Sequence, residues 1–309
     1  MKTFGGILAA FLMGTLVTVC GDALAQEKKQ AVFDSAQSAA KALVDAVRSG
    51  NRAKLVEIVG PTSRSWLITS DEPADRAEGQ VFLAAYDRKN SVVMDGENKA
   101  VLTVGEDDWP FPAPIVRRSG KWAFDAAAGR EEILNRRVGR NELDTIQTLL
   151  AIVDAQREYA AADTDGNGLK DYAARFNSTA GKKDGLYWQS AEGQPQSPLG
   201  AVVAKAVREG YGPQVKTGKV EPYHGYLFRM ITAQGPNAAG GAYDYFVDGR
   251  LFGGFAVVAY PAEYGTTGVK TFIVNHDGVV YEKDLGAKTA EVAERIKRFD
   301  PDKSWTKAP

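Results

Sequence analysis

The sequence predicts an α+β fold in two domains, each with helices packed against an antiparallel sheet. The main observation is the order of predicted helices and strands. In each half, apolar residues recur first at helical spacing and then in short runs divided by turns. Hydrophobic residues make up 44% and charged residues 25%, which is typical of a globular protein. A chain of 309 residues is also longer than the roughly 100 to 150 residues of a common domain, so we expect two cores.

The start of the chain reads as a secretory signal peptide that covers residues 1–25. Lys2 gives a positive start, residues 7–19 form an apolar run, and Ala23-Leu24-Ala25 is a cleavage site of the small-x-small type. We therefore expect a mature chain that begins at Gln26 and is periplasmic or secreted. The apolar run is shorter than the roughly 20 residues of a membrane span. No later segment is as apolar, so we expect no integral membrane segment after cleavage.

The only cysteine, Cys20, leaves one alternative open, which is a lipoprotein anchored through its sulfur. Val17 is bulky at a place where lipid-attachment signals have a small residue, so cleavage after Ala25 is favoured. If Cys20 leaves with the signal peptide, the mature chain has no thiol. That excludes disulfides, cysteine nucleophiles and thiolate metal sites together.

The first domain is predicted to span residues 26–139. Breaks at Ser49-Gly50-Asn51 and Gly60-Pro61 divide its helical patterns, which are expected at 33–47, 52–59 and 78–87. The spacing then changes to the alternation of strands, which are expected at 91–94, 99–104, 113–118 and 121–125. Of the known shapes with this order of elements, the cone-like, nuclear-transport-factor-like fold fits best.

The second domain, residues 140–309, begins inside the longest helical pattern, which runs from Gly129 to about Asp163. We place the boundary at Gly139-Arg140-Asn141, where Asn141 is expected to cap a new helix. Helices are then expected at 170–176, 201–209 and 289–299, and strands at 225–233, 242–247, 255–260, 270–275 and 279–284.

Several motifs resemble the bacterial family of secreted proteins catalogued as domain of unknown function 2950. In the second half they are Lys182-Lys-Asp-Gly-Leu-Tyr-Trp188, Ser197-Pro-Leu-Gly200, Pro222-Tyr-His-Gly-Tyr226, Gly253-Gly-Phe-Ala256, Lys270-Thr-Phe-Ile-Val-Asn275 and Tyr281-Glu-Lys-Asp-Leu-Gly286. In the first half they are Trp109-Pro-Phe-Pro112, Trp122-Ala-Phe-Asp125 and Arg137-Val-Gly-Arg-Asn-Glu142. The resemblance spans almost the whole mature chain, and it brings no activity with it.

A second resemblance concerns the long helix, the Asp-rich loop and the strands that follow. Phe255-Ala-Val-Val-Ala-Tyr-Pro261 and the run from Tyr264 to Gly278 look like the globular heads of type IV pilins and pseudopilins, some of which hold Ca²⁺ in a loop. The membrane-embedded helix that builds those filaments is missing, because the helix before the loop carries Arg140, Asp144 and Asp154. Only the architecture of a pilin head is therefore implied.

The segment from Asp163 to Asp171 has the spacing of a calcium loop. Its expected metal ligands are Asp163, Asp165, Asn167, Leu169 through its carbonyl, and Asp171. Gly168 takes the sharp-turn position, but Ala174 stands where a bidentate Glu is usual, so an acid from elsewhere such as Asp184 would have to complete the shell. The alternative is a solvated turn, since Asp, Asn and Gly favour turns in any case.

No motif in the sequence indicates a reaction. His224 and His276 are the only histidines, and a catalytic or zinc site would need them to meet carboxylates such as Asp244, Glu263 or Asp277. Aromatic side chains are candidates either for the core or for a groove that binds a peptide or glycan. Those considered are Trp66, Trp109, Trp122, Tyr187, Trp188 and, as the better candidates for a groove, Tyr223, Tyr226, Tyr243 and Tyr245.

We therefore expect a secreted cell-envelope protein that is not an enzyme, binds a protein or glycan partner and has a loop stabilised by Ca²⁺. The 38 basic and 39 acidic residues nearly balance, which argues against a nucleic-acid partner. The alternative is an envelope hydrolase that acts on glycan or peptide through His224 and nearby acids. One structural observation distinguishes the binding protein from the hydrolase, because the hydrolase requires a histidine within hydrogen-bond reach of a carboxylate.

Overall fold

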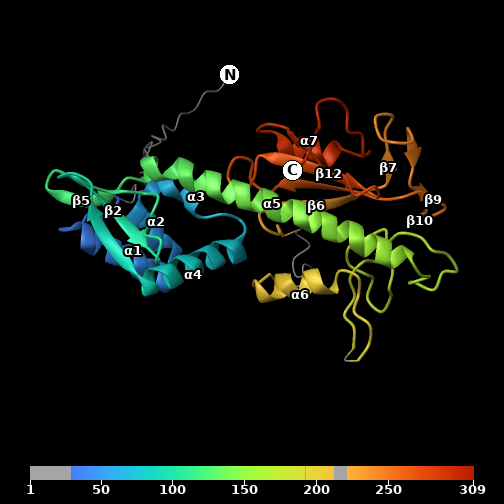
Figure 1. Ribbon diagram of the computed structural model, residues 1–309, viewed down its shortest axis with the longest axis horizontal. Coiled ribbons are helices and arrows are strands. Elements are labelled where there is room, and N and C mark those ends of the chain that lie inside the picture. The colour runs from blue at the N-terminus through green and yellow to red at the C-terminus, as the bar shows by residue number, and fades with distance from the viewer. Residues whose placement is uncertain (1–28, 192, 212–220) are drawn as a thin grey trace, which may run out of the picture.

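The computed structural model describes residues 29–191, 193–211 and 221–309. The predicted signal peptide, its cleavage site and Cys20 lie outside these residues. The described chain forms two lobes, each with its own apolar core, joined by one long helix (Figure 1). Both lobes combine helices with antiparallel strands, so the predicted α+β class is confirmed. Within the described ranges, no helix combines the length and the apolar character needed to cross a membrane.

The first lobe begins with helices that local sequence specifies well. Ser35 and Ser38 form a capping box at the start of α1, in which the Ser38 N–H donates to the Ser35 hydroxyl at 3.1 Å. Asp71 caps α4, which therefore begins earlier than the sequence predicts. The helical elements are α1 (Ala36–Arg48), α2 (Arg52–Val59), η1 (Pro61–Ser63), α3 (Arg64–Leu67) and α4 (Glu72–Arg88).

The first sheet has five antiparallel strands in the order β1-β2-β4-β5, with β3 paired to β2. They are β1 (Asn90–Met94), β2 (Lys99–Val104), β3 (Trp109–Pro110), β4 (Ile115–Arg118) and β5 (Lys121–Phe124). In β2, Ala100, Leu102 and Val104 are buried and alternate with more exposed residues, so one face of the sheet covers the core. Helix α1 packs against this sheet and buries a stripe that includes Ala39 and Leu43.

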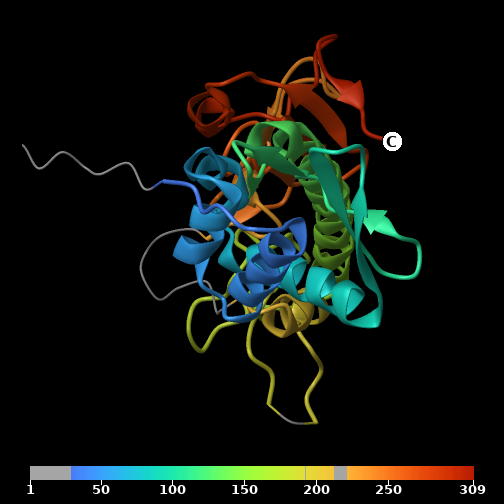
Figure 2. The ribbon, with the colours of Figure 1, turned by 90° about the vertical axis from the view of Figure 1, so that its left-hand side faces the viewer.

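Helix α5 (Ala126–Ala160) is a single helix of 35 residues that belongs to both lobes. Its first turns pack on the first core, where Gly129 lies so close to Ala113 that a Cβ would come within 2.7 Å of it. Its later residues, such as Leu149 and Val153, enter the second core. The predicted cap at Asn141 is wrong, because the helix continues through this residue. Figure 2 looks from the side of the first lobe, whose helices lie in front of α5.

The second lobe is built on a five-stranded antiparallel sheet in the order β14-β13-β12-β11-β6. Its strands are β6 (Tyr226–Ile231), β11 (Ala256–Pro261), β12 (Lys270–Asn275), β13 (Tyr281–Asp284) and β14 (Thr306–Lys307). Helix α5 lies on one face and α7 (Thr289–Arg295) on the other (Figure 1). Every residue of β11 is buried, as expected for a central strand covered on both faces.

The irregular parts of the second lobe differ most from the sequence expectation. The predicted helix at 170–176 is wrong, because Tyr172 instead forms a β-bridge with Leu251. The predicted strand at 242–247 is two short strands in separate ladders. One ladder pairs β7 (Ala233–Gln234) with β8 (Tyr243–Asp244), and the other pairs β9 (Phe246–Val247) with β10 (Arg250–Leu251). Helix α6 (Gly200–Arg208) is confirmed.

Candidate functional site

The Asp- and Gly-rich loop follows directly on the end of α5, and its side chains bond to its own main chain. Asp163 accepts from the N–H of Asn167 at 2.8 Å and from the N–H of Gly168 at 3.0 Å. Asp165 accepts from the same Asn167 N–H at 3.2 Å, so two carboxylates converge on one donor. The Asn167 side chain in turn accepts from the Leu169 N–H at 2.9 Å. These local bonds fold the loop back on itself.

Asp171 is the most enclosed acid of the loop, with only 6% of its surface exposed. Among the described residues, its carboxylate accepts only from the Asn167 amide, at 3.3 and 3.4 Å. Arg250 approaches Asn167 rather than Asp171, with its Nη1 3.3 Å from the Asn167 Oδ1. A buried carboxylate with one weak donor is poorly compensated for the loss of water.

The negative charge of the loop also affects the pKa of Tyr159, on the last turn of α5. Its hydroxyl donates to the Lys183 carbonyl at 2.7 Å. Burial is the main cause that raises the pKa of Tyr159, and four carboxylate charges add to it, those of Asp165, Asp171, Asp184 and Asp163. The loop is therefore a region of concentrated negative charge.

The predicted ligands share one loop without forming a ready cage. In the described part of the chain, no group of three or more His, Cys, Asp or Glu side chains is placed to hold a metal ion. Asp184, the acid expected to complete the shell, instead accepts from the N–H and hydroxyl of Thr179 at 2.7 and 2.8 Å. Calcium binding here stays a prediction.

A second site, at the contact between the lobes, surrounds His224. His224 and Gly225 both have left-handed backbone angles, with φ of +49° and +74°. They form a tight turn in which the main chains of Tyr223 and Tyr226 bond to each other at 2.9 and 3.1 Å. The turn sets the histidine just before β6, at the edge of the second sheet.

The His224 ring lies between two carboxylates. Its Nε2 is 3.2 Å from the Glu209 Oε2 and its Nδ1 is 3.6 Å from the Asp144 Oδ2. Glu209 follows α6 and Asp144 lies in the middle of α5. The ring of Tyr223 lies 4.2 Å from that of His224, and its hydroxyl donates to Glu209 at 3.4 Å. Because the His224 side chain is only 17% exposed, the site is largely enclosed.

Asp71, from the first lobe, connects this cluster to the other half of the molecule. It is 2% exposed, and its Oδ2 accepts from the Gly225 N–H at 2.6 Å and from the Tyr211 hydroxyl at 3.0 Å. The Tyr211 hydroxyl also accepts from the His224 N–H at 3.2 Å. Burial, and then the charge of Asp71, raise the pKa of Tyr211. The cluster is therefore part of the contact between the lobes.

Other polar contacts surround the same junction and come from α5. The Asn141 amide donates to the Thr267 carbonyl at 2.8 Å. The next residue, Glu142, accepts from the N–H groups of Val269 and Lys270 at 3.0 and 2.9 Å. These side chains hold a loop of the second lobe against the middle of the helix.

His276 lies apart from His224, because the two flank opposite ends of the same sheet. Its Nε2 is 3.9 Å from the Asp277 carboxylate, and its Nδ1 is buried without a partner among the described residues. The ring packs edge-on against Tyr245, with ring centres 5.5 Å apart. A zinc site that joins both histidines is excluded by this separation.

The tyrosines do not line one groove, so that expectation was wrong. Tyr223 lies at the junction, whereas Tyr243 and Tyr245 lie on the far side of the sheet beside His276. Tyr226 is fully buried and donates to the Lys270 carbonyl at 2.9 Å. These tyrosines are close in sequence around glycine-rich turns, but that does not place them close together in the fold.

The acids that reach His224 were not the ones considered from the sequence. Asp144 and Glu209 belong to two different helices, and only the fold brings them together. Glu263, which was considered, instead accepts from the Ser70 N–H at 2.8 Å in another contact between the lobes. The only sequence signal for the site is the Tyr-His-Gly turn at 223–225.

Comparison with protein families matches residues 30–308 to the family described as Protein of unknown function (DUF2950). The match covers nearly all of the described chain. Among the curated proteins and among the solved structures, nothing matches the chain significantly.

Proposed function

The chain belongs to the DUF2950 family, whose description names no activity, and from that premise we propose a secreted, non-catalytic binding protein of the cell envelope with a calcium-stabilised loop. The observation that carries the non-catalytic role is the use of His224 at the junction. Both ring nitrogens face carboxylates inside this enclosed contact, where Nε2 is buried and makes no hydrogen bond among the described residues, and the neighbouring N–H groups bond to Tyr211 and Asp71. A general base must instead reach the substrate with one nitrogen.

Two pockets on the surface agree with this proposal. One is lined by Pro61, Thr62, Arg64, Ser65, Ile68 and Glu263, and a second by residues of β12, α7 and the C-terminal segment. His224 lines neither of them. Catalytic groups are expected on the wall of a pocket, where they meet substrate.

Calcium is the ion that best fits the loop from Asp163 to Asp171. The carboxylates of Asp163 and Asp165 share one donor, and the buried Asp171 has only a weak one. A hard cation with oxygen ligands would compensate these charges, and weak extracellular calcium loops lack the full ligand set in the same way. Gly166 and Gly168 have φ of +73° and +89°, which leaves the backbone room to close around the ion.

Thermal unfolding tests the loop. The mature chain from Gln26 is unfolded with excess EDTA and then with excess Ca²⁺ or Mg²⁺. An ion at about 100 times its dissociation constant adds roughly 2.7 kcal/mol of stability. We expect Ca²⁺ to raise the midpoint of the wild type and to leave an Asp163→Ala/Asp165→Ala variant unchanged. An Asp95→Ala/Asp107→Ala variant removes two exposed acids of the first lobe and should respond like the wild type.

A response to Ca²⁺ that survives in the Asp163→Ala/Asp165→Ala variant would place the ion elsewhere. No response in any of the proteins would leave the loop as a turn stabilised by its own hydrogen bonds. Either result removes the calcium-stabilised loop from the proposal and leaves the binding role to be tested separately.

The second candidate is an envelope hydrolase, and the distance of 3.2 Å between His224 and Glu209 favours it. In that interpretation one carboxylate orients the ring, and the other ring nitrogen takes the proton from the attacking group. Cell-wall glycan and envelope peptides are incubated with the wild type and with His224→Gln, and products are followed by mass spectrometry. The non-catalytic proposal expects no product from either protein. Product that disappears in His224→Gln would establish the hydrolase instead.

Secretion rests on residues 1–25 and is tested by the mass of the protein recovered from a cell fraction. We expect a periplasmic or extracellular product that starts at Gln26. A lipid on Cys20 would support the lipoprotein alternative.

A further inference from the structure

We propose that the pocket between α7 and the C-terminal segment binds a carboxylate-bearing sugar of an envelope glycan. This inference rests on the proposed binding function and adds the class of ligand. The pocket has a volume of about 360 Å³ and is lined by Ile273, Arg295, Ile296, Lys297, Arg298, Asp300 and Trp305. Such a volume lies at the small end of the range for ligand pockets, which suits a single sugar ring.

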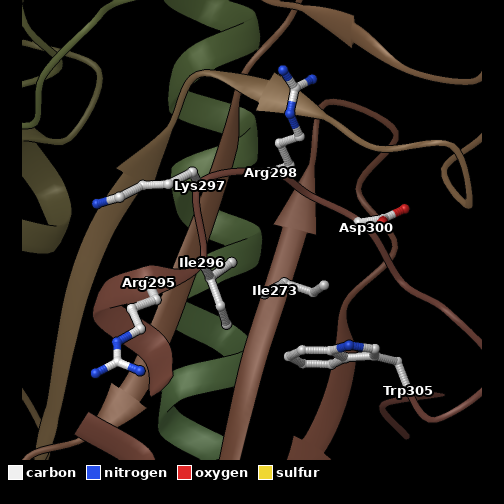
Figure 3. A pocket seen from close by; sticks show the side chains of 7 residues that line it. All are labelled: Ile273, Arg295, Ile296, Lys297, Arg298, Asp300 and Trp305. Atoms are coloured by element: carbon white, nitrogen blue, oxygen red, sulfur yellow. The ribbon is translucent and has the colours of Figure 1, made fainter. Parts of the chain in front are cut away.

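The centre of the pocket is apolar. Figure 3 shows Ile296 and Ile273 in the middle, with the indole of Trp305 on one side. Ile273 comes from β12, and Ile296 follows the end of α7. An indole beside aliphatic side chains offers a flat surface for the C–H face of a pyranose ring, and its edge remains available to polar groups.

Trp305 is held in position before any ligand arrives. Its main-chain N–H donates to the Asp302 carbonyl at 3.0 Å, which fixes the backbone, and the next residue begins β14. The Lys283 ammonium lies 5.7 Å from the centre of the indole and donates to the Ser304 hydroxyl at 2.6 Å. A side chain that is fixed in this way loses little freedom on binding.

The rim of the pocket is basic. Arg295, Lys297 and Arg298 are all exposed, and in Figure 3 their charged ends point outward from the apolar centre, on the outer rim of the pocket. Arg298 contacts Asp244 at 3.2 Å, and Lys297 donates to the Glu294 carbonyl at 3.0 Å. Among the described residues, Arg295 has no hydrogen-bond or ion-pair partner, so its guanidinium is available for a bidentate contact with a carboxylate.

The one acid of the pocket is already engaged. Asp300 accepts from the main-chain N–H of Asn237 at 2.8 Å and from its side-chain amide at 3.0 Å. The lining holds three cations and one anion, and Asp244 offsets the charge of Arg298, so that Arg295 and Lys297 outweigh Asp300 and leave the rim positive, although the whole chain has a formal charge of −1. Charge complementarity therefore selects an anionic ligand, and the indole selects one with a flat ring face.

Calorimetric titration of the mature chain with tri-galacturonate tests this assignment, with neutral galactotriose and inorganic phosphate as comparison ligands. We expect tri-galacturonate to bind at least about tenfold more tightly than either, and more weakly as salt is added. Arg295→Gln/Lys297→Gln and Trp305→Ala should each weaken binding by about tenfold or more. Arg76→Gln/Arg88→Gln removes the same charge from exposed positions of the first lobe and should bind like the wild type.

Four results would overturn the assignment. Equal binding of the neutral trisaccharide would show that the cations do not select the ligand, and equal binding of phosphate would show a site for any anion. Full binding by both pocket variants would place the sugar elsewhere on the chain. Absence of binding to the folded wild type would remove the sugar as ligand, and the calcium and turnover experiments would still judge the broader proposal. Thermal midpoints confirm that each variant is folded.

Discussion

The contact between the lobes gives the sharpest prediction, which concerns the substitution Asp71→Ala. Three hydrogen bonds end on this carboxylate, from the N–H groups of Gly225 and Ala74 and from the Tyr211 hydroxyl. The bond from Ala74 is a helix cap, worth about 1 kcal/mol. Each of the other two joins the lobes in a buried place, where a hydrogen bond to a charged group contributes about 1.5 to 3 kcal/mol.

We expect Asp71→Ala to lower the free energy of unfolding by about 3 to 5 kcal/mol, since it also leaves a buried N–H and a buried hydroxyl without an acceptor. Urea unfolding at neutral pH measures this change, with far-UV circular dichroism and tryptophan fluorescence as two probes. Because each lobe has its own core, loss of the contact should also separate the transitions of the two lobes.

The matched control is Asp125→Ala. Asp125 also caps a helix, through the Ala128 N–H at 3.2 Å, but its other contact is an ion pair at 3.0 Å with the largely exposed Arg118. It should therefore lose only about 1 kcal/mol. Equal losses in the two variants would refute the reasoning, because the bonds between the lobes would then contribute nothing beyond the cap. Tyr211→Phe should fall between them, since it removes one donor and leaves the Gly225 bond in place.

Two further predictions concern packing and pH. Gly139→Ala should raise the free energy of unfolding by about 0.5 to 1 kcal/mol, because its added Cβ meets nothing within 4 Å in the helix. Gly129→Ala should lower it by about 1 to 3 kcal/mol, because its Cβ would lie 2.7 Å from Ala113. Urea unfolding measures both changes. Burial is the main cause that raises the pKa of Tyr211 and of Tyr223 in the folded protein. Their contribution to the free energy of unfolding is therefore fully present below the unfolded pKa of about 10. Above that pH the free energy of unfolding falls by about 1.4 kcal/mol per pH unit for each tyrosine. Unfolding between about pH 9 and about pH 11 measures this loss, and the Phe variant of either residue should reduce the slope.

Local sequence patterns predicted many helices and strands, because these elements depend on residues that are close to each other in the sequence. The strand at 99–104 follows from a short run rich in apolar and β-branched residues after a turn, and β2 has these bounds. Helix α1 follows from apolar residues at helical spacing and the break at Ser49-Gly50-Asn51. The Asp loop was also found from sequence, since its turns depend on neighbouring Asp, Asn and Gly residues.

The failures have a common cause in contacts between distant residues. Asn141 has the chemistry of a cap, yet its amide bonds to Thr267, and the helix passes through it. Gly139 did not end the helix either, because one glycine weakens a helix by only about 1 kcal/mol and packing on two cores exceeds that. The bridge between Tyr172 and Leu251 likewise overrides a short local helical pattern.

The same distinction explains which sites the sequence could reveal. A metal loop is local, so the spacing of Asp163 to Asp171 suffices to suggest it. His224, Asp144 and Glu209 come from a turn and two helices, and the basic pocket unites β12, the end of α7 and Trp305. Neither arrangement produces a characteristic residue spacing that could be recognised in a single sequence.

Helix α5 touches the first core, the junction and the Asp- and Gly-rich loop, but this continuity alone does not couple them. Coupling requires an element with two arrangements whose balance both sites change. The described contacts of α5 with the second lobe are direct hydrogen bonds, such as those of Asn141 and Glu142, and they define a single arrangement. The pocket lies on the α7 face of the sheet, opposite to α5. Ion binding in the loop and sugar binding in the pocket should therefore act independently, and the experiments on one do not decide the other.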